Sequence, residues 1–99
     1  MRVISRKILR DFCQSHADSC DALYGWYRVA SKAKWHNLTE VQAIYKTAEA
    51  VGNFTVFNIK GNRYRLIVDL IYKKQRIYIK YVLTHAEYSK NKWKNDPHY

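Results

Sequence analysis

The stretch FTVFNIKGNRYRLIVDLIYKKQRIYIKYVLT, residues 54–84, decides the fold of this chain. Apolar and polar residues alternate along it with a period of two, which is the pattern of half-buried β-strands. Gly61-Asn62 and Lys73-Lys74-Gln75 interrupt the alternation, and both segments have the composition of tight turns. The stretch therefore predicts three antiparallel strands, at residues 54–60, 63–72 and 76–84, joined as a meander.

The alternation also assigns the side chains to two faces of the sheet. On one face we expect the side chains that pack against helices, namely Phe57, Ile59, Leu66, Val68, Leu70, Ile77, Ile79, Tyr81 and Leu83. The opposite face would collect Val56, Asn58, Lys60, Arg65, Ile67, Asp69, Ile71, Tyr78, Lys80, Val82 and Thr84. That second face must be covered by another part of the chain, or it must be the working surface.

The first half of the chain predicts helices after one short strand. The strand is expected at Arg2–Ser5, and its serine is placed to cap a helix from Arg6 to about His16. Asp18 is placed to cap a second helix, in which apolar residues recur at intervals of three and four. A shorter, poorly patterned third helix is expected from Leu38 toward Tyr45 or Thr47, before a turn at residues 52–53.

The order of these elements predicts one α+β domain over residues 1–99, with the helices segregated on one face of the sheet. A short C-terminal helix is expected before Asn95-Asp96-Pro97. The apolar runs are shorter than the roughly 18 residues that span a bilayer, and the opening lacks the apolar core of a signal peptide. We therefore expect a cytoplasmic protein without a membrane partner.

The charge of the chain is +10 and is concentrated in its second half. Residues 54–99 hold ten Lys or Arg against three acidic residues, whereas residues 1–53 hold eight against five. A surplus of this size on a small domain favours a polyanionic partner, most often nucleic acid. The alternatives are a solvated basic surface and a face that binds an acidic protein.

The cysteines and histidines do not predict a metal site or a cofactor. Cys13 and Cys20 lack the CxxC spacing of zinc ligands, and we expect two partly buried thiols. The four histidines are scattered along the sequence.

Arg65, His85 and Tyr88 are the candidates for chemistry on RNA. Arg65 would bind a phosphate, although pairing with Asp69 on an exposed strand is an equal alternative. His85 and Tyr88 follow the last strand and share one side if the segment is helical. A strand-end histidine is more often a cap or a surface group, but it also suits proton transfer near neutral pH. Cleavage of RNA needs a base for the ribose 2′-hydroxyl, cations for the phosphate and an acid for the leaving oxygen.

The run Asn58–Lys90 resembles the HigB-type toxins of bacterial toxin–antitoxin pairs, within the RelE-like superfamily of messenger-RNA endonucleases. The most specific parts of the resemblance are Lys60-Gly61-Asn62, Tyr64-Arg65-Leu66 and Thr84-His85-Ala86-Glu87-Tyr88. The resemblance implies a RelE-like α+β fold, a small antiparallel sheet with two N-terminal helices packed on one face. It implies metal-independent cleavage of messenger RNA, in many relatives on the ribosome, with no cofactor. It also implies neutralisation by a cognate HigA-like antitoxin, usually a helix-turn-helix protein.

The resemblance further implies roles for individual residues. Arg65 matches the strand arginine that contacts the scissile phosphate, and Lys60 is the best match for a catalytic or phosphate-binding lysine. His85 matches a catalytic residue after the last strand, and Tyr88 matches an aromatic residue of the tail, where this chain continues with Ser89 instead of aspartate. The surrounding candidates for RNA binding are Asn58, Asn62, Arg63, Lys80 and Lys90.

Two other functions remain open at this point. One is a basic module that binds RNA or an acidic partner without cleaving it. The other is an inactive toxin that only binds its antitoxin. Convergence of Arg65, His85 and Tyr88 around one phosphate would favour the enzyme.

Overall fold

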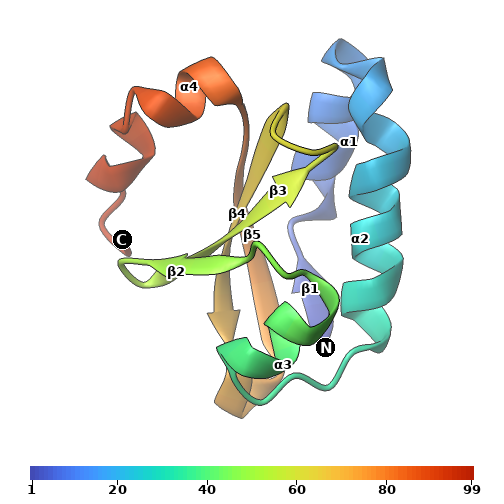
Figure 1. Ribbon diagram of the computed structural model, residues 1–99, viewed down its shortest axis with the longest axis vertical. Helices are drawn as coiled ribbons and strands as arrows, with labels where there is room; N and C mark the ends of the chain where they lie inside the picture. The colour runs from blue at the N-terminus through green and yellow to red at the C-terminus, as the bar shows by residue number, and fades with distance from the viewer.

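A five-stranded sheet forms the centre of the molecule, in a computed structural model that describes all residues from 1 to 99 (Figure 1). The order of the strands across the sheet is β1-β5-β4-β3-β2. The strands are β1 (Arg2–Ile4), β2 (Glu49–Val51), β3 (Phe54–Ile59), β4 (Tyr64–Ile71) and β5 (Arg76–Thr84). The predicted meander is confirmed, because β3, β4 and β5 pair in antiparallel order.

The edges of the sheet differ from the prediction. β1 pairs with β5 in parallel, so the sheet is mostly rather than wholly antiparallel. β2 was not predicted, because it is three residues long and carries no alternating pattern. It forms a hairpin with β3, and Gly52 lies in the turn with a left-handed φ of 60°, a conformation that glycine adopts without strain.

A β-bulge at Lys80 changes which side chains face the helices. Ile67 pairs with Tyr81 and Val68 pairs with Ile79, so Lys80 is an extra residue in β5. The strand alternation therefore reverses after Ile79. The prediction was wrong for the end of β5: Val82 lies in the core with the helices, whereas Tyr81 and Leu83 lie on the opposite face.

Two antiparallel helices, α1 (Arg6–Ser15) and α2 (Cys20–Lys32), cover one face of the sheet (Figure 1). The predicted caps were wrong. Ser5 has a φ of 75° and makes no capping bond, and Asp18 lies in a 3-10 turn, η1 (Ala17–Ser19), one residue too early to cap α2. This tight connection brings Cys13 and Cys20 within 5.1 Å between Cα atoms, and their sulfurs form a disulfide. The prediction of two thiols was therefore wrong.

The third helix, α3 (Leu38–Ile44), is confirmed and has a well-defined start. The Asn37 side chain caps it by accepting a hydrogen bond from the Glu40 backbone N–H at 3.0 Å. The chain then reaches β2 and the edge of the sheet.

The main core lies between the sheet and the two N-terminal helices, on what we call the helix face of the sheet. It is a cluster of 16 buried residues, including Leu23 and Trp26 from α2 and Phe57 and Leu66 from the sheet. No helix of the protein is both long enough and apolar enough to cross a membrane.

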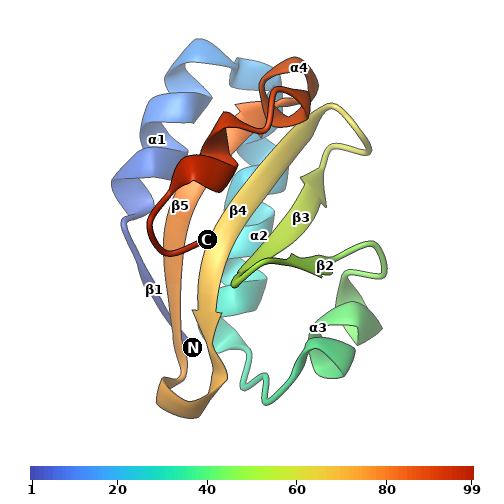
Figure 2. The ribbon, with the colours of Figure 1, turned by 90° about the vertical axis from the view of Figure 1, so that its left-hand side faces the viewer.

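The opposite face, which we call the tail face, is covered by the C-terminal segment (Figure 2). This segment contains α4 (His85–Ser89) and a 3-10 turn, η3 (Lys92–Asn95). Its covering is thin: the buried cluster on this face has only four members, Phe54, Val56, Ile67 and Trp93. The tail face is therefore partly covered and partly available to a ligand.

Candidate active site

Arg65 is the most unusual side chain on the tail face. It is only 9% exposed, and its Nη1 donates to the carbonyl oxygens of Asn62 and Tyr64 at 3.0 and 3.2 Å. It makes no ion pair, so the predicted alternative of pairing with Asp69 was wrong. Its Nε and Nη2 donate no hydrogen bond to the protein. A nearly buried cation normally has an anionic partner, and no carboxylate of the protein pairs with Arg65.

Tyr88 covers Arg65 and is itself held in place by the tail. The Arg65 guanidinium lies 5.3 Å from the centre of the Tyr88 ring, in a cation–π contact. On the tail side, the Trp93 ring stacks on Tyr88 at 5.2 Å, and Trp93 Nε1 donates to the Tyr88 carbonyl oxygen at 3.1 Å. Burial raises the pKa of Tyr88, with Glu49 adding to this effect and Arg65 opposing it. Burial thus disfavours the ionised form of the Tyr88 hydroxyl.

The start of α4 fixes the positions of His85 and Tyr88. Thr84 and Glu87 form a capping box, in which Thr84 Oγ1 accepts from the Glu87 N–H at 3.2 Å and Glu87 Oε1 accepts from the Thr84 N–H at 2.9 Å. The His85 backbone N–H donates to the Arg63 carbonyl oxygen at 3.2 Å. His85 is exposed and its side chain makes no hydrogen bond, although it shares one side of the helical turn with Tyr88.

Asn58 and Asn62 lie beside Arg65. Asn58 is directly opposite Arg65 in the β3–β4 pairing, and its Nδ2 donates to Asn62 Oδ1 at 3.5 Å. The carbonyl oxygen of Asn62 is one of the two that hold the guanidinium. The Asn58 side chain thus lies on the same face of the sheet as Arg65 and contacts the Asn62 side chain.

Lys60 and Arg63 are drawn away from Arg65 toward the helices. Lys60 follows β3 with a φ of 52°, and its Nζ donates to the Asp18 carbonyl oxygen at 3.1 Å. Arg63 Nη1 forms an ion pair with the Asp18 carboxylate at 2.7 Å, and the Tyr64 hydroxyl donates to the same carboxylate. These contacts lower the pKa of Asp18, and the bond from Tyr64 is the main cause. Asp18 therefore anchors the β3–β4 hairpin to the helices.

Lys80 also has an acidic partner, in the tail. Its Nζ lies 3.4 Å from Asp96 Oδ2, and the Tyr81 hydroxyl donates to the same oxygen at 2.6 Å. The bond from Tyr81 is the main cause that lowers the pKa of Asp96 to about 2. Lys80 thus holds the tail against the sheet.

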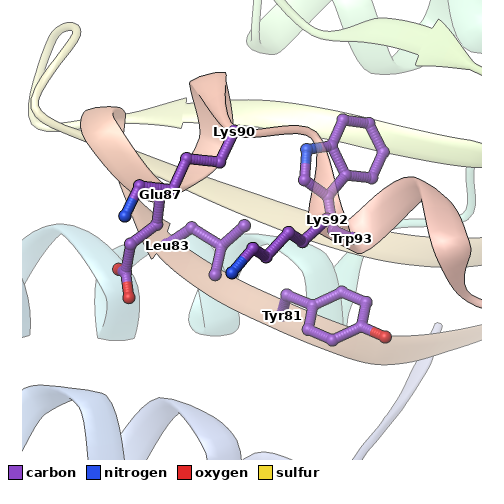
Figure 3. A pocket seen from close by; sticks show the side chains of 6 residues that line it. All are labelled: Tyr81, Leu83, Glu87, Lys90, Lys92 and Trp93. Carbon is purple, nitrogen blue, oxygen red and sulfur yellow. The ribbon is translucent and has the colours of Figure 1, made fainter.

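Lys90 lies on the other side of α4 from Tyr88. It borders a hollow of about 320 Å³ together with Tyr81, Leu83, Glu87, Lys92 and Trp93 (Figure 3). Of the predicted residues, the structure brings together Arg65, Tyr88, Asn58 and Asn62, with His85 beside Tyr88 on α4. It does not bring Lys60, Arg63, Lys80 or Lys90 into that cluster.

Sequence reasoning missed three residues that support the site. Trp93 stacks on Tyr88, Asp96 binds the tail to β5 by accepting from Tyr81, and Asp18 binds the β3–β4 hairpin by accepting from Tyr64. For Asp18 and Asp96 the only sequence signal is that an acidic residue is rare in a chain with 18 Lys or Arg against 8 Asp or Glu, and Trp93 has no such signal. No group of three or more His, Cys, Asp or Glu side chains is arranged to hold a metal ion.

Comparison with known proteins identifies the family of the chain. Residues 19–91 match the family model HigB_toxin, described as a RelE-like toxic component of a toxin–antitoxin system. The chain belongs to the HigB toxin family. The matched residues, 19–91, include every predicted site residue, from Asn58 to Lys90.

Two curated HigB relatives cover nearly the whole chain. The mRNA interferase toxin HigB of Escherichia coli strain K12 is 24% identical over 91 residues, which cover 89% of this chain and 88% of the relative. The mRNA interferase HigB of Escherichia coli O6:H1 is 23% identical over 93 residues, which cover 91% of this chain and 90% of the relative. The resemblance noted in the sequence is therefore confirmed at the level of the HigB family.

Proposed function

We propose that this protein is an endoribonuclease toxin that cleaves messenger RNA without a metal ion and is neutralised by a cognate antitoxin. The observation that carries the proposal is the nearly buried Arg65, which has no anionic partner in the protein and is covered by Tyr88. A scissile phosphate is the anion that would complete this cluster in a chain of charge +10. The names of the HigB relatives, mRNA interferases, support the same substrate.

In the proposed reaction the ribose supplies the nucleophile. The 2′-oxygen attacks the adjacent phosphorus and loses its proton to a base. The bond from phosphorus to the 5′-oxygen of the next nucleotide then breaks, and that oxygen takes a proton from an acid. The products are a 2′,3′-cyclic phosphate and a free 5′-hydroxyl, so no water or cofactor is consumed.

Arg65, Tyr88 and His85 carry out different steps of this proposed reaction. The free N–H groups of Arg65 bind the phosphate oxygens and stabilise the charge that develops in the transition state. In this proposal Tyr88, which lies over Arg65, acts as the acid, and His85 acts as the base. Asn58 and Asn62 orient the nucleotide beside Arg65.

Variants of Arg65, His85 and Tyr88 test the proposal through growth arrest on expression and through cleavage of RNA, with and without ribosomes. His85→Ala removes an exposed side chain that makes no hydrogen bond, and Tyr88→Phe keeps the ring stacked on Trp93, so both should fold normally. We expect each to lose about 10²- to 10⁴-fold in cleavage rate. Arg65→Lys keeps the charge but loses the planar fork, and we expect about 10²-fold loss.

The matched control is Arg10→Ala, which removes an exposed cation from α1 and should retain full activity. Unchanged cleavage in His85→Ala, Tyr88→Phe and Arg65→Lys would contradict the assignment. RNA that is bound but left intact by the wild-type protein would favour the binding module instead. Co-expression with the neighbouring reading frame tests the antitoxin, which should restore growth.

A further inference from the structure

The hollow on the far side of α4 is not used by the proposed reaction. Its floor is formed by Tyr81 and Leu83 of β5, and Trp93 of η3 closes one side. The side chains of Glu87, Lys90 and Lys92 stand around its rim (Figure 3). A volume of about 320 Å³ lies at the lower end of the range for small-molecule sites.

The β-bulge creates this hollow. Because Lys80 is an extra residue in β5, Tyr81 and Leu83 leave the helix core and present an apolar surface on the tail face. At the same point β5 becomes the edge of the sheet, since its pairing with β1 ends at Tyr78. The hollow is therefore open to solvent along this edge.

The rim of the hollow carries charges that the protein leaves unpaired. Lys90 and Lys92 are exposed and take part in no ion pair, unlike Lys60, Arg63 and Lys80. Glu87 uses Oε1 in the capping box, and its Oε2 makes no hydrogen bond. The backbone bond from Thr84 is the main cause that lowers the pKa of Glu87, so the carboxylate is ionised at neutral pH. Two ammonium groups and one carboxylate oxygen thus surround an apolar floor.

We propose that this hollow binds one nucleotide that flanks the cleaved bond, with its base on Tyr81 and Leu83, its phosphate at Lys90 and Lys92, and a base amino group at Glu87. A carboxylate accepts hydrogen bonds from the exocyclic amino groups of cytosine, adenine and guanine, which uracil lacks. Trp93 links the two sites, because it lines the hollow and also stacks on Tyr88. The inference rests on the proposed function for the identity of the ligand as RNA.

Binding of an uncleavable RNA tests the subsite separately from catalysis. The probe is a fluorescently labelled 2′-O-methyl RNA hexamer, whose blocked 2′-oxygens prevent cleavage, and the readout is fluorescence anisotropy at several salt concentrations. We expect Lys90→Gln/Lys92→Gln to weaken binding about tenfold and to reduce the slope of log affinity against log salt by about 1 to 2. The matched control is Lys73→Gln/Lys74→Gln, which removes the same charge from the exposed turn η2 (Tyr72–Lys74) outside the hollow.

The Glu87→Gln variant tests recognition of the base. Glutamine can keep the capping box, so α4 should remain in place. Hexamers of cytosine and uracil should differ in affinity for the wild-type protein, and we expect the variant to lose most of that preference. Equal affinity of the wild-type protein for both hexamers would overturn the base contact.

The results separate failure of the subsite from failure of the proposed function. If the wild-type protein cleaves RNA but the Lys90/Lys92 and Lys73/Lys74 variants lose affinity equally, the subsite is wrong and the nuclease stands. If the wild-type protein cleaves no RNA but only the Lys90/Lys92 variant loses affinity, the subsite stands and the catalytic proposal is wrong.

Discussion

The two faces of the sheet are covered in different ways. On the helix face, α1 and α2 pack against the strands through 16 buried residues. On the tail face, a helix of five residues and a 3-10 turn cover a cluster of four. Because apolar burial is the main source of stability, the helix face holds the fold together. The tail face can then carry a nearly buried cation without an anionic partner.

The tail is attached by a few specific contacts rather than by a large core. Asp96 accepts from Tyr81 and lies beside Lys80, and the Asn53 side chain donates to the Tyr99 carbonyl oxygen at 3.0 Å. Trp93 is the one large side chain that the tail buries. Local opening of such a segment costs less free energy than global unfolding. The two faces should therefore respond differently to similar changes.

The largest effect on stability is expected from Phe57→Ala on the helix face. Phe57 is fully buried and contacts the rings of Trp26, Trp35 and Tyr45. Removing the ring should lower the free energy of unfolding by about 3 to 5 kcal/mol, because a cavity would remain in the core. Chemical denaturation measures the change, and a loss below about 1 kcal/mol would mean that the helix face is not the main core.

A smaller loss of stability is expected from Trp93→Ala on the tail face. The tail should detach locally, so the loss of unfolding free energy should be smaller than in Phe57→Ala. Activity should nevertheless fall about ten- to hundredfold, because Tyr88 loses its stacking partner over Arg65. The rate of amide hydrogen exchange should increase in residues 85–99 and stay unchanged in α2. Trp93→Phe is the control, since it keeps an aromatic ring against Tyr88, and equal protection of the tail in both variants would contradict the idea.

The smallest effect is expected from pH acting on Asp96. Its pKa is lowered from 3.8 to about 2 in the fold, so the carboxylate contributes stability above pH 4 and loses that contribution as the pH falls toward 2. The difference in unfolding free energy between the wild-type protein and Asp96→Asn should therefore shrink over this range. Thermal unfolding of both proteins at several pH values measures it. A difference that is constant from pH 5 to pH 2 would show that Asp96 is not a charged anchor of the tail.

The strands and turns could be predicted from the sequence because their signals are local. The alternation along β3, β4 and the part of β5 up to Ile79 matches the observed faces of the sheet. It correctly places Arg65 on the face opposite the two N-terminal helices. The bulge at Lys80 has no such signal, since an inserted residue only becomes visible through its pairing with β4. The faces of Tyr81, Val82 and Leu83 were therefore wrong in the prediction.

The contact between Arg65 and Tyr88 agrees with the prediction, whereas the positions of the lysines could not be predicted. Strand alternation and helical spacing determine where Arg65 and Tyr88 point. The side-chain positions of Lys60 and Lys80 depend on acidic partners that are distant in the sequence. Lys60 pairs with Asp18, 42 residues before it, and Lys80 pairs with Asp96, 16 residues after it. A long flexible side chain points toward the acidic residue that the fold brings near it, and a single sequence does not reveal which acidic residue that is.

The extra residue at Lys80 lets one strand contribute apolar side chains to both faces of the sheet. Before it, Ile77 and Ile79 belong to the core and must keep their size and shape. After it, Val82 still belongs to that core, whereas Tyr81 and Leu83 lie on the tail face, so shortening Tyr81 or Leu83 leaves no cavity under the helices. One inserted residue thus separates the side chains of β5 that support the helices from those that line the hollow on the tail face.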